Sequence, residues 1–267
     1  MKMKNTIKTT LIFTLFAILS CKKSKQQPAP IDPKQEEKPT IPKEQKNLIP
    51  IEISSSGITI TFKYIENTGL LSEVNLSTGR RFLITNTNNM PVKLELFPVE
   101  DRAYYVEYRN ADNRISRANQ FTSNGKNSTP ADKFQMSYDG YGQLTNIKRY
   151  LVDNSLASEK QLSYTEEGLL KEITTVERDY TTTDDYSYDV HKGVFKNVKY
   201  LQILLIEMKL DAITFGANTL LQYSCPSNPA LNKTYAYTYN DDGYPIKQTI
   251  KSAGSTQVFD IKYAEIK

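Results

Sequence analysis

Apolar and polar residues alternate along most of the chain, in short runs that end at a tyrosine and are followed by a polar turn containing glycine. The unit is plainest in residues 136–144, 162–170 and 237–245, where the glycine follows the tyrosine by four positions, as in Tyr138 and Gly142. Alternation with a period of two is typical of a strand with one buried face. Each unit therefore predicts a strand, a tight turn and a returning strand.

The glycine has a mechanical role in these turns. Three polar residues can form a type I turn, and the next residue must then adopt a positive φ, which glycine does without a Cβ clash. Looser copies, each one residue longer, pair Tyr64 with Gly69, Tyr108 with Asn113 and Tyr188 with Gly193. A final alternating strand surrounds Tyr263.

The spacing of the marker tyrosines predicts the architecture. From Tyr108 to Tyr263 the successive spacings are 30, 26, 24, 51 and 24 residues, so one unit is about two strands. Further strands are expected at Arg81–Ile84 and Val92–Phe97. Consecutive hairpins form an antiparallel meander. We therefore expect an all-β fold in residues 51–267, with the hairpins forming a closed or strongly curved barrel-like sheet.

The 51-residue spacing predicts one insertion, residues 194–233, and this insertion contains the one candidate helix. Apolar residues recur there at steps of three and four: Val198, Leu201, Leu204, Leu205 and Met208. Ile203 and Ile206 extend the apolar surface almost all round, which predicts a short buried helix. We interpret it as a plug or cap over one end of the sheet; the alternative is an exposed docking face for a partner.

The N-terminus has the three regions of a secretory signal peptide, residues 1–20. A basic stretch with Lys2, Lys4 and Lys8 precedes an apolar run, Leu11–Leu19, which is shorter than the ~20 residues that a membrane-spanning helix needs. The run ends in Ile18-Leu19-Ser20-Cys21, which resembles the lipobox of bacterial lipoproteins. The resemblance implies that lipid, including palmitate, is attached to Cys21, which becomes the first mature residue. An ordinary signal peptide that happens to contain cysteine is the alternative.

A spacer rich in proline, lysine and glutamine follows the anchor, so residues 21–50 combine the lipidated Cys21 with a disordered linker. In an extended polyproline conformation the spacer could hold the domain roughly 80 Å from the bilayer. Two or more acyl chains make a stable anchor, because each buried CH₂ contributes about 0.8 kcal/mol. The lipid bilayer is therefore an expected partner, contacted through Cys21.

Charge and cysteine content narrow the function. The net charge of +4 resides in the signal peptide and spacer, since residues 48–267 contain 24 basic and 26 acidic residues. A nucleic-acid partner is therefore not expected. Only Cys225 remains besides Cys21, so no disulfide framework is expected. We interpret Cys225 as a buried small hydrophobe; a reactive thiol is the alternative.

The segment Tyr138-Asp139-Gly140-Tyr141-Gly142-Gln143-Leu144-Thr145 resembles the YD repeat of large bacterial shell-forming toxins. The whole arrangement of lipobox, spacer, hairpin units and apolar insertion is similar to a family of bacterial lipoproteins that carry a domain of unknown function with a porin-like fold. The resemblance implies this fold for about residues 55–267 and brings no catalytic residues. Strands such as Gln143–Tyr150 and Lys171–Arg178 carry too much charge for a lipid-facing wall, so we expect a water-soluble barrel or half-barrel.

No catalytic, cofactor-binding or metal site is predicted. His191 is the sole histidine, and its position in an expected turn indicates ordinary solvent exposure. Three acid pairs could bind calcium or form a glycosidase pair: Asp184-Asp185, Asp241-Asp242 and Glu166-Glu167. Adjacent strand residues point to opposite faces, and acids in turns cap backbone groups, so structural roles are favoured. The many tyrosines also suit half-buried strands, which leaves a glycan partner as an alternative.

These features predict a membrane-anchored envelope lipoprotein with a non-catalytic binding or scaffolding role, whose partner is an envelope protein or a glycan. The alternatives are a carboxylate-dependent glycan hydrolase and a carrier of a small apolar ligand. Lys22 and Lys23 follow the anchor cysteine, which resembles lipoproteins that are sorted to the outer membrane. We expect attachment to the outer membrane with the domain facing the periplasm.

Overall fold

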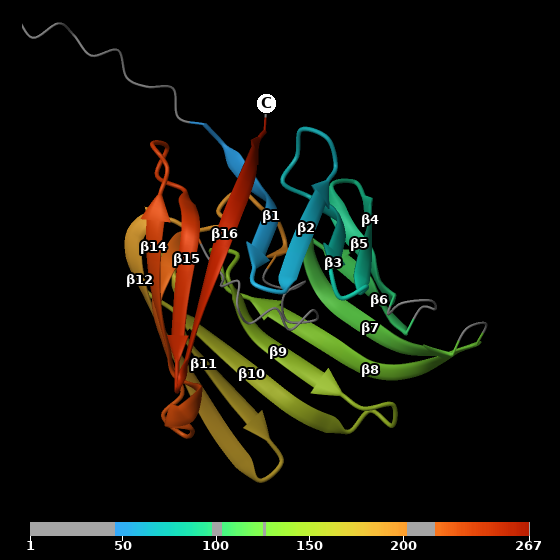
Figure 1. Ribbon diagram of the computed structural model, residues 1–267. Helices are drawn as coiled ribbons and strands as arrows, with labels where there is room; N and C mark the ends of the chain where they lie inside the picture. The colour runs from blue at the N-terminus through green and yellow to red at the C-terminus, as the bar shows by residue number, and fades with distance from the viewer. Residues whose placement is uncertain (1–45, 98–102, 125–126, 202–216, 267) are drawn as a thin grey trace, which may run out of the picture. The chain divides into compact units, whose positions relative to one another are not determined.

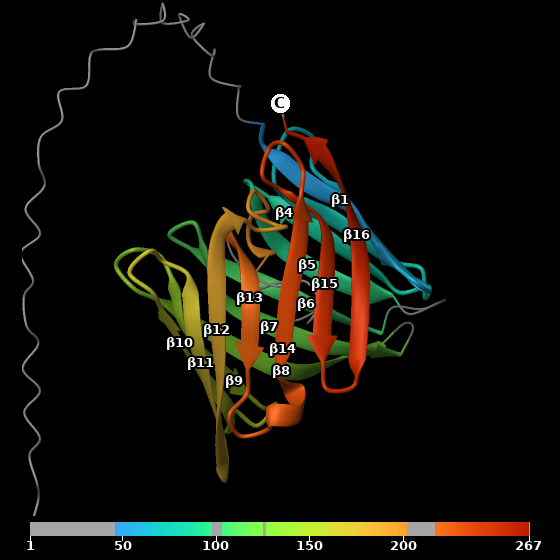
Figure 2. The same cartoon turned by 60° about the vertical axis from the view of Figure 1, so that its left-hand side comes forward.

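The computed structural model describes residues 46–97, 103–124, 127–201 and 217–266, which form a closed antiparallel barrel of sixteen strands (Figure 1, Figure 2). Each strand pairs with its neighbours in the chain, and β1 closes on β16. The strands are β1 (Leu48–Ser55), β2 (Ile58–Tyr64), β3 (Leu71–Leu76), β4 (Arg81–Thr87), β5 (Met90–Phe97), β6 (Tyr104–Ala111), β7 (Arg114–Asn124), β8 (Asn127–Tyr138), β9 (Leu144–Tyr150), β10 (Leu156–Tyr164), β11 (Leu170–Glu177), β12 (Tyr180–Lys192), β13 (Asn218–Ser224), β14 (Lys233–Tyr239), β15 (Pro245–Ser252) and β16 (Ser255–Glu265). The predicted all-β meander is confirmed, and the sheet is closed.

The signal peptide, Cys21 and most of the spacer lie outside the described residues. The barrel begins slightly before residue 51, because β1 starts at Leu48 and its first three residues are buried. The expected strands at Arg81–Ile84 and Val92–Phe97 lie within β4 and β5.

Inward positions of the barrel are mainly apolar. Along β2, Ile60 and Phe62 point inward and are buried, whereas the next residue, Lys63, points outward and is exposed. The buried cluster continues round the wall through residues on most strands, among them Ile53, Val74, Leu94, Val106, Ile115, Leu220 and Ile261. Burial of one such side chain contributes about 1.5–3 kcal/mol, so this inner surface stabilises the closed sheet.

Outward positions carry charged side chains that pair across strands. Lys63 lies 3.0 Å from Glu73, and Lys262 lies 3.0 Å from Glu52. On β9, one of the strands expected to be too charged for lipid, Lys148 lies 3.9 Å from Glu159 of β10. A barrel that spans a membrane needs an outward apolar band about 25 Å tall. The outer face of this barrel carries charged pairs where a membrane-spanning barrel would carry apolar side chains.

The three plain turns adopt the conformation that the sequence predicts. Gly142, Gly168 and Gly243 all have positive φ, between 77° and 89°. In the looser unit after Tyr64, Asn67 takes the positive φ instead. Gly69 has another role there: a Cβ at this position would lie 1.9 Å from the carbonyl oxygen of Asn197, so only glycine lets that segment pass.

Many of the tyrosines act as braces inside the barrel. A hydroxyl near the end of an even-numbered strand donates to a backbone carbonyl near the start of the preceding strand, at 2.7–2.9 Å in five hairpins: Tyr64 to Pro50, Tyr138 to Ile115, Tyr164 to Leu144, Tyr237 to Leu220 and Tyr263 to Pro245. Each brace ties together the two strands at the end where their hairpin has no turn. The phenol thus supplies apolar surface and also satisfies its own hydroxyl.

The expected insertion, residues 194–233, is partly wrong. β13 lies within it and is a strand of the barrel, and residues 194–200 form turns instead of the start of a helix. The spacing of the tyrosines failed to predict β13 for two reasons. Tyr188 lies inside β12, which continues to Lys192, and β13 has no tyrosine-turn-glycine unit. Residues 202–216, most of the predicted helix, lie outside the described residues. Within the described residues the helical element with defined bounds is a short 3-10 turn, η1 (Pro229–Leu231).

Residues 193–201 close one end of the barrel. Val194, Phe195 and Leu201 are buried in the core, and the ring of Phe195 meets Phe62 edge to face at 5.4 Å. Asn197 donates to the Leu48 carbonyl at 2.9 Å. The backbone N–H of Lys199 donates to Gly69 and the hydroxyl of Tyr200 to Asn113, so the segment contacts turns on several sides of this end.

Side chains reinforce the weakest backbone pairing of the sheet, between β13 and β14. Only two residue pairs, Gln222 with Thr234 and Tyr223 with Lys233, are in register there. Beyond them the carboxylate of Asp189 on β12 accepts hydrogen bonds from three side chains: Thr219 of β13, Tyr239 of β14 and His191 of its own strand. This carboxylate therefore links three strands where backbone pairing has ended.

We expect Tyr164→Phe to lower the free energy of unfolding by about 1–2 kcal/mol at pH 7, because the Leu144 carbonyl loses its donor. Burial raises the pKa of Tyr164 to about 12. The contribution is therefore present below pH 10, the ordinary tyrosine pKa, and is lost as the pH rises toward 12. Urea unfolding at several pH values measures both effects. Tyr141→Phe is the control, since Tyr141 is 94% exposed; equal losses in the two variants would contradict the brace.

Asp189→Asn should lower stability by about 2 kcal/mol at neutral pH, because hydrogen bonds to a charged acceptor are lost. Burial alone would raise the pKa of Asp189, but hydrogen bonds from Thr219, His191 and Tyr239 outweigh it and lower the pKa. The stabilisation is thus present above the ordinary aspartate pKa of about 3.9 and disappears as the pH falls through the lower folded value. Acid unfolding curves should be flatter for this variant than for Asp185→Asn. Identical curves for the two variants would rule out the link.

Candidate functional site

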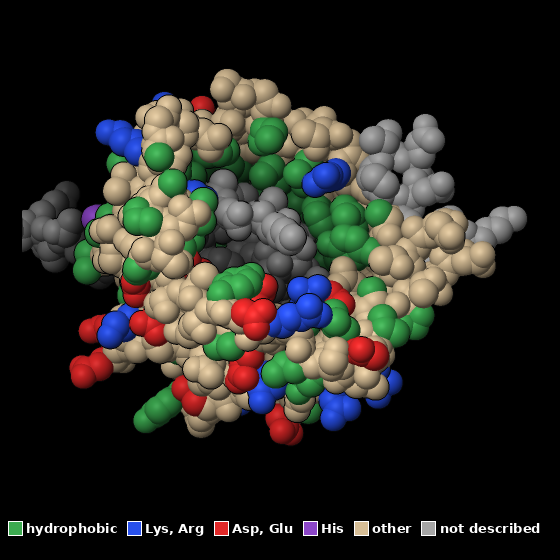
Figure 3. Space-filling model, turned by 90° about the horizontal axis from the view of Figure 1, so that it is seen from below, with side chains coloured by type: hydrophobic (Ala, Val, Ile, Leu, Met, Phe, Trp, Pro, Cys, Tyr) green, Lys and Arg blue, Asp and Glu red, His purple; other side chains and the backbone are tan. Residues whose placement is uncertain are grey.

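The two ends of the barrel differ. Residues 193–201 close one end, and the opposite end is formed by the turns that join β1 to β2, β9 to β10, β11 to β12 and β15 to β16. Figure 3 shows this second end hollowed, with hydrophobic side chains on part of the wall and charged side chains along one side of the rim. We call it the hollow end.

The inner wall at the hollow end has a polar strip on β8 to β12. The register places Arg149, Ser158, Glu177 and Tyr180 in one inward row, because Phe134 of the core pairs with Arg149. Arg149 Nε donates to Asp132 at 2.8 Å, and the Tyr180 hydroxyl donates to Glu177. The strip therefore contains two polar pairs, a guanidinium with a carboxylate and a phenol with a carboxylate.

Among the described residues, the inward acids do not form the carboxylate pair of a glycan hydrolase. Glu177 pairs with Tyr180 on β12, and Asp184 lies four residues further along that strand, which separates the two backbone positions by about 13 Å. Asp132 is three strands away from Glu177, again roughly 14 Å. Glycosidases need about 5–10 Å between the carboxyl groups. Asp184 is also held by the Tyr223 hydroxyl at 2.8 Å, so its observed role is structural.

The three acid pairs singled out in the sequence are not brought together. Asp241-Asp242 and Glu166-Glu167 lie in turns, as expected. Asp184 and Asp185 lie within β12 on opposite faces of the sheet, since Asp184 pairs with inward Ile173 and its neighbour with Glu172. Within the described ranges no three His, Cys, Asp or Glu side chains gather as a metal site would require.

His191 and Cys225 are both structural in this fold. The prediction that His191 lies in a turn is wrong: it belongs to β12, because that strand continues past Tyr188. Its ring stacks on Tyr239 at 4.3 Å, and its Nδ1 lies 2.9 Å from Asp189. Cys225 is a free, buried thiol, 3.3 Å from the Ser227 hydroxyl, which confirms the interpretation as a small buried residue.

The seam between the first and last strands leaves part of β16 without a partner strand. Pairing of β1 with β16 runs from Leu48 with Glu265 to Ser54 with Asp260, whereas β16 extends further, to Ser255. Beyond this point β1 turns back into β2, and the two strands pair up to Ser55 and Ile58. No sequence pattern predicts this gap, because the gap arises from the stagger of two hairpin turns.

The backbone polar groups at this gap can be assigned from the ladder. The Ile266 N–H donates to the Asn47 carbonyl at 2.8 Å, so even-numbered residues of β16 direct their N–H and C=O groups to the β1 side. The two-residue turn between Ser252 and Ser255 supports the same assignment, because the N–H and C=O groups of odd-numbered β16 residues then point to β15. Thr256 and Val258 therefore point their backbone groups beyond the last paired residue of β1.

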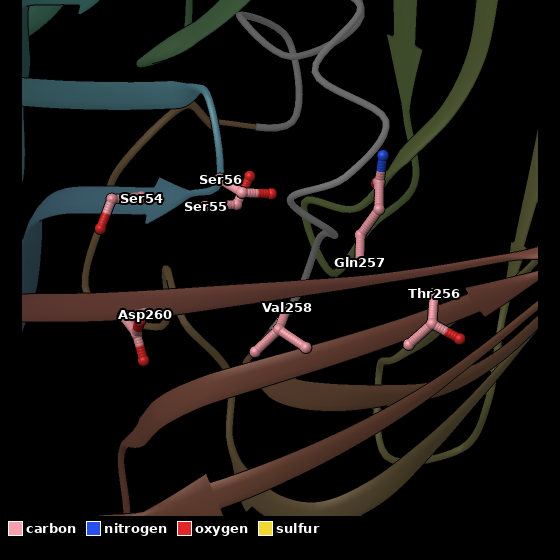
Figure 4. Close-up of a pocket in the computed structure, with 7 residues that line it drawn as sticks. All are labelled: Ser54, Ser55, Ser56, Thr256, Gln257, Val258 and Asp260. Carbon is pink, nitrogen blue, oxygen red and sulfur yellow. The ribbon is translucent and has the colours of Figure 1, made fainter.

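A pocket of about 500 Å³ lies at this gap (Figure 4). Its lining is almost entirely polar and uncharged, with one exposed valine and one acid: Ser54, Ser55, Ser56, Thr256, Gln257, Val258 and Asp260. Figure 4 shows Gln257 on the opposite side of β16 from Val258 and Asp260. Side chains of an occupant would therefore meet the amide on one face and the valine and carboxylate on the other.

Comparison with known proteins bears on the fold. No family model and no curated protein match the sequence. In the described parts of the chain there is no helix with the length and hydrophobicity to cross a bilayer.

Two solved structures are similar to this barrel. A porin-like protein from Bacteroides uniformis ATCC 8492 has a TM-score of 0.53 and 11% sequence identity, over 80% of this chain and 96% of that one. A porin-like protein from Bacteroides vulgatus ATCC 8482 has a TM-score of 0.51 and 12% identity, over 81% of this chain and 99% of that one. Identities this low show a shared fold alone. The expected porin-like fold is confirmed, whereas the lipoprotein family and the YD-like repeat remain predictions.

Proposed function

We propose that this protein is a lipoprotein of the bacterial envelope, anchored to the outer membrane through Cys21, with the barrel as a non-catalytic binding module in the periplasm. The observation that carries the proposal is the polarity of the barrel. Charged pairs such as Lys63 with Glu73 and Lys262 with Glu52 occupy the outer face, and the apolar side chains point inward. Such a surface suits water, so the acyl chains on Cys21 supply the membrane contact.

The binding role is supported by the difference between the two ends. One end is closed by residues 193–201, which are held by hydrogen bonds to neighbouring turns and by side chains buried in the core. The hollow end instead presents the polar strip, with Arg149 and Asp132, and the pocket beside Thr256 and Val258. Separated inward carboxylates and the structural roles of His191 and Cys225 favour recognition over chemistry.

A carrier of a small apolar ligand is a second candidate. Inward apolar side chains near the hollow end are only partly buried: Phe134 packs at the margin of the core, and inward Ile58 is 39% exposed. Such side chains could contact a small hydrophobic molecule. Retention of a fluorescent fatty acid by the purified chain, with displacement by an unlabelled one, would distinguish this candidate.

Cys21→Ala is expected to abolish metabolic labelling with palmitate and to move the protein from the membrane fraction to the soluble fraction, because the thiol that receives lipid is removed. Cys225→Ala is the matched control, since it removes the other cysteine, which is buried in the barrel. It should keep both the label and the membrane location. Label on the Cys21→Ala protein, or its loss from the Cys225→Ala protein, would show that the anchor is assigned to the wrong residue.

Protease added to intact cells should leave the barrel uncut, and the same protease should cut the spacer once the outer membrane is permeabilised. The reason is that the proposed orientation places spacer and barrel on the periplasmic side. Immunoblotting against the barrel measures both states. Release of the barrel from intact cells would place it on the cell surface instead.

A further inference from the structure

We infer that the edge of β16 between Ser255 and Phe259 binds an extended peptide segment of a partner protein by strand addition. The inference rests on the proposed binding role of the barrel and names its ligand class. The inference is based on the different lengths of the two strands at the seam. Ser54 and Asp260 are the last residue pair between β1 and β16, and β16 continues beyond this pair to Ser255.

The backbone of this edge specifies the kind of ligand. Thr256 and Val258 each point one N–H and one C=O away from β15, and the described part of β1 has no residue opposite them. Donors and acceptors that alternate along a strand are matched by the backbone of another extended strand. A peptide in that position can form up to four backbone hydrogen bonds, which is the usual basis of strand addition.

The side chains leave this edge unprotected. Proteins usually block exposed strand edges with lysine, proline, a bulge or a covering loop. Thr256, Gln257 and Val258 include no charge and no proline, and threonine and valine are among the residues that favour strands. Val258 is 43% exposed on the outer face. The edge therefore has the composition of a strand that accepts a partner.

The space beside the edge suits a short strand. The pocket of about 500 Å³ lies on the line along which β1 would have continued, and the turn at Ser56 and Gly57 leads the chain away from it. A peptide in this place continues β1 and runs antiparallel to β16. Its length is set by the unpaired stretch, Ser255 to Phe259, at four or five residues.

The lining indicates which side chains the peptide carries. On the outer face, Val258 and Thr256 favour β-branched neighbours, which pack well across strands. Asp260 is the one charged residue of the lining, and its side chain is 64% exposed. A lysine or arginine next to Asp260 complements this charge, although Lys247 also lies 3.5 Å from it. The partner segment is thus short, uncharged, β-branched and flanked by one basic residue.

The test uses the full chain with Cys21→Ala and an acetylated, amidated peptide of sequence Lys-Thr-Val-Thr-Val, whose N-terminal lysine lies toward Asp260 when the peptide runs antiparallel to β16. Titration should show saturable binding, and hydrogen exchange should show the Thr256 and Val258 amides unprotected in the free chain and protected in the complex. The same peptide N-methylated at alternate residues should bind about tenfold or more weakly, since it lacks the matching donors.

Two proline variants of β16 separate the binding edge from the stability of the barrel. Val258→Pro removes an N–H that has no strand partner, so its urea midpoint should stay near that of the parent while peptide binding falls about tenfold or more. Lys262→Pro removes an N–H on the same side of the same strand where β1 is paired, so its midpoint should fall.

Several results would overturn the inference. They are protection of the Thr256 and Val258 amides in the free chain, equal binding by the N-methylated peptide or by the Val258→Pro protein, absence of binding by the folded chain, and a dimer of the chain paired through this edge. None of these results affects palmitate labelling or protease protection. Failure of strand addition is therefore distinguishable from failure of the envelope-anchored role.

Discussion

Pairing of the first strand with the last is the interaction on which the rest of this structure depends. β1 and β16 are almost the whole barrel apart in sequence, and their six residue pairs cover most of the two free edges that an open sheet of this length would expose. Tyr244 strengthens the closure, because its hydroxyl accepts from the Leu48 N–H and from Asn197 and donates to the Lys46 carbonyl. The same contact joins the segment that closes one end. Closure and capping are therefore one connected set of bonds.

Closure also explains the polarity of the molecule. Once the sheet is closed, each strand has one face inside and one outside, and the period-two alternation of the sequence assigns apolar residues to the inside. The tyrosines combine apolar and polar contacts inside the barrel. Their rings pack in the core, and their hydroxyls donate to backbone carbonyls such as those of Pro50 and Pro245. A porin-like fold is thereby combined with an outer face that carries ion pairs. The fold alone consequently does not decide whether such a barrel spans a membrane.

The sequence was sufficient to predict the hairpins, the turn glycines and the class of fold, because these depend on local alternation and on one backbone conformation. It was insufficient for β13 and for the position of His191, because β12 runs past its marker tyrosine and β13 carries no turn signal of its own. The pocket beside Thr256 and Val258 was also beyond sequence reasoning. It results from the stagger between strands 200 residues apart, and serine, threonine and glutamine carry no chemical signature. Turn chemistry is local, whereas the register of a closing seam is not.

The most direct test of the account is a cross-strand proton contact at the seam. Ile53 and Ile261 face each other between hydrogen-bonded pairs, which is the arrangement that brings the two α-protons of an antiparallel pair closest together. A nuclear Overhauser effect between these α-protons in the folded chain is the predicted result. Its absence, together with rapid exchange of the β1 amides that face β16, would show an open sheet and contradict the closure from which the polarity, the cap and the free edge of β16 follow.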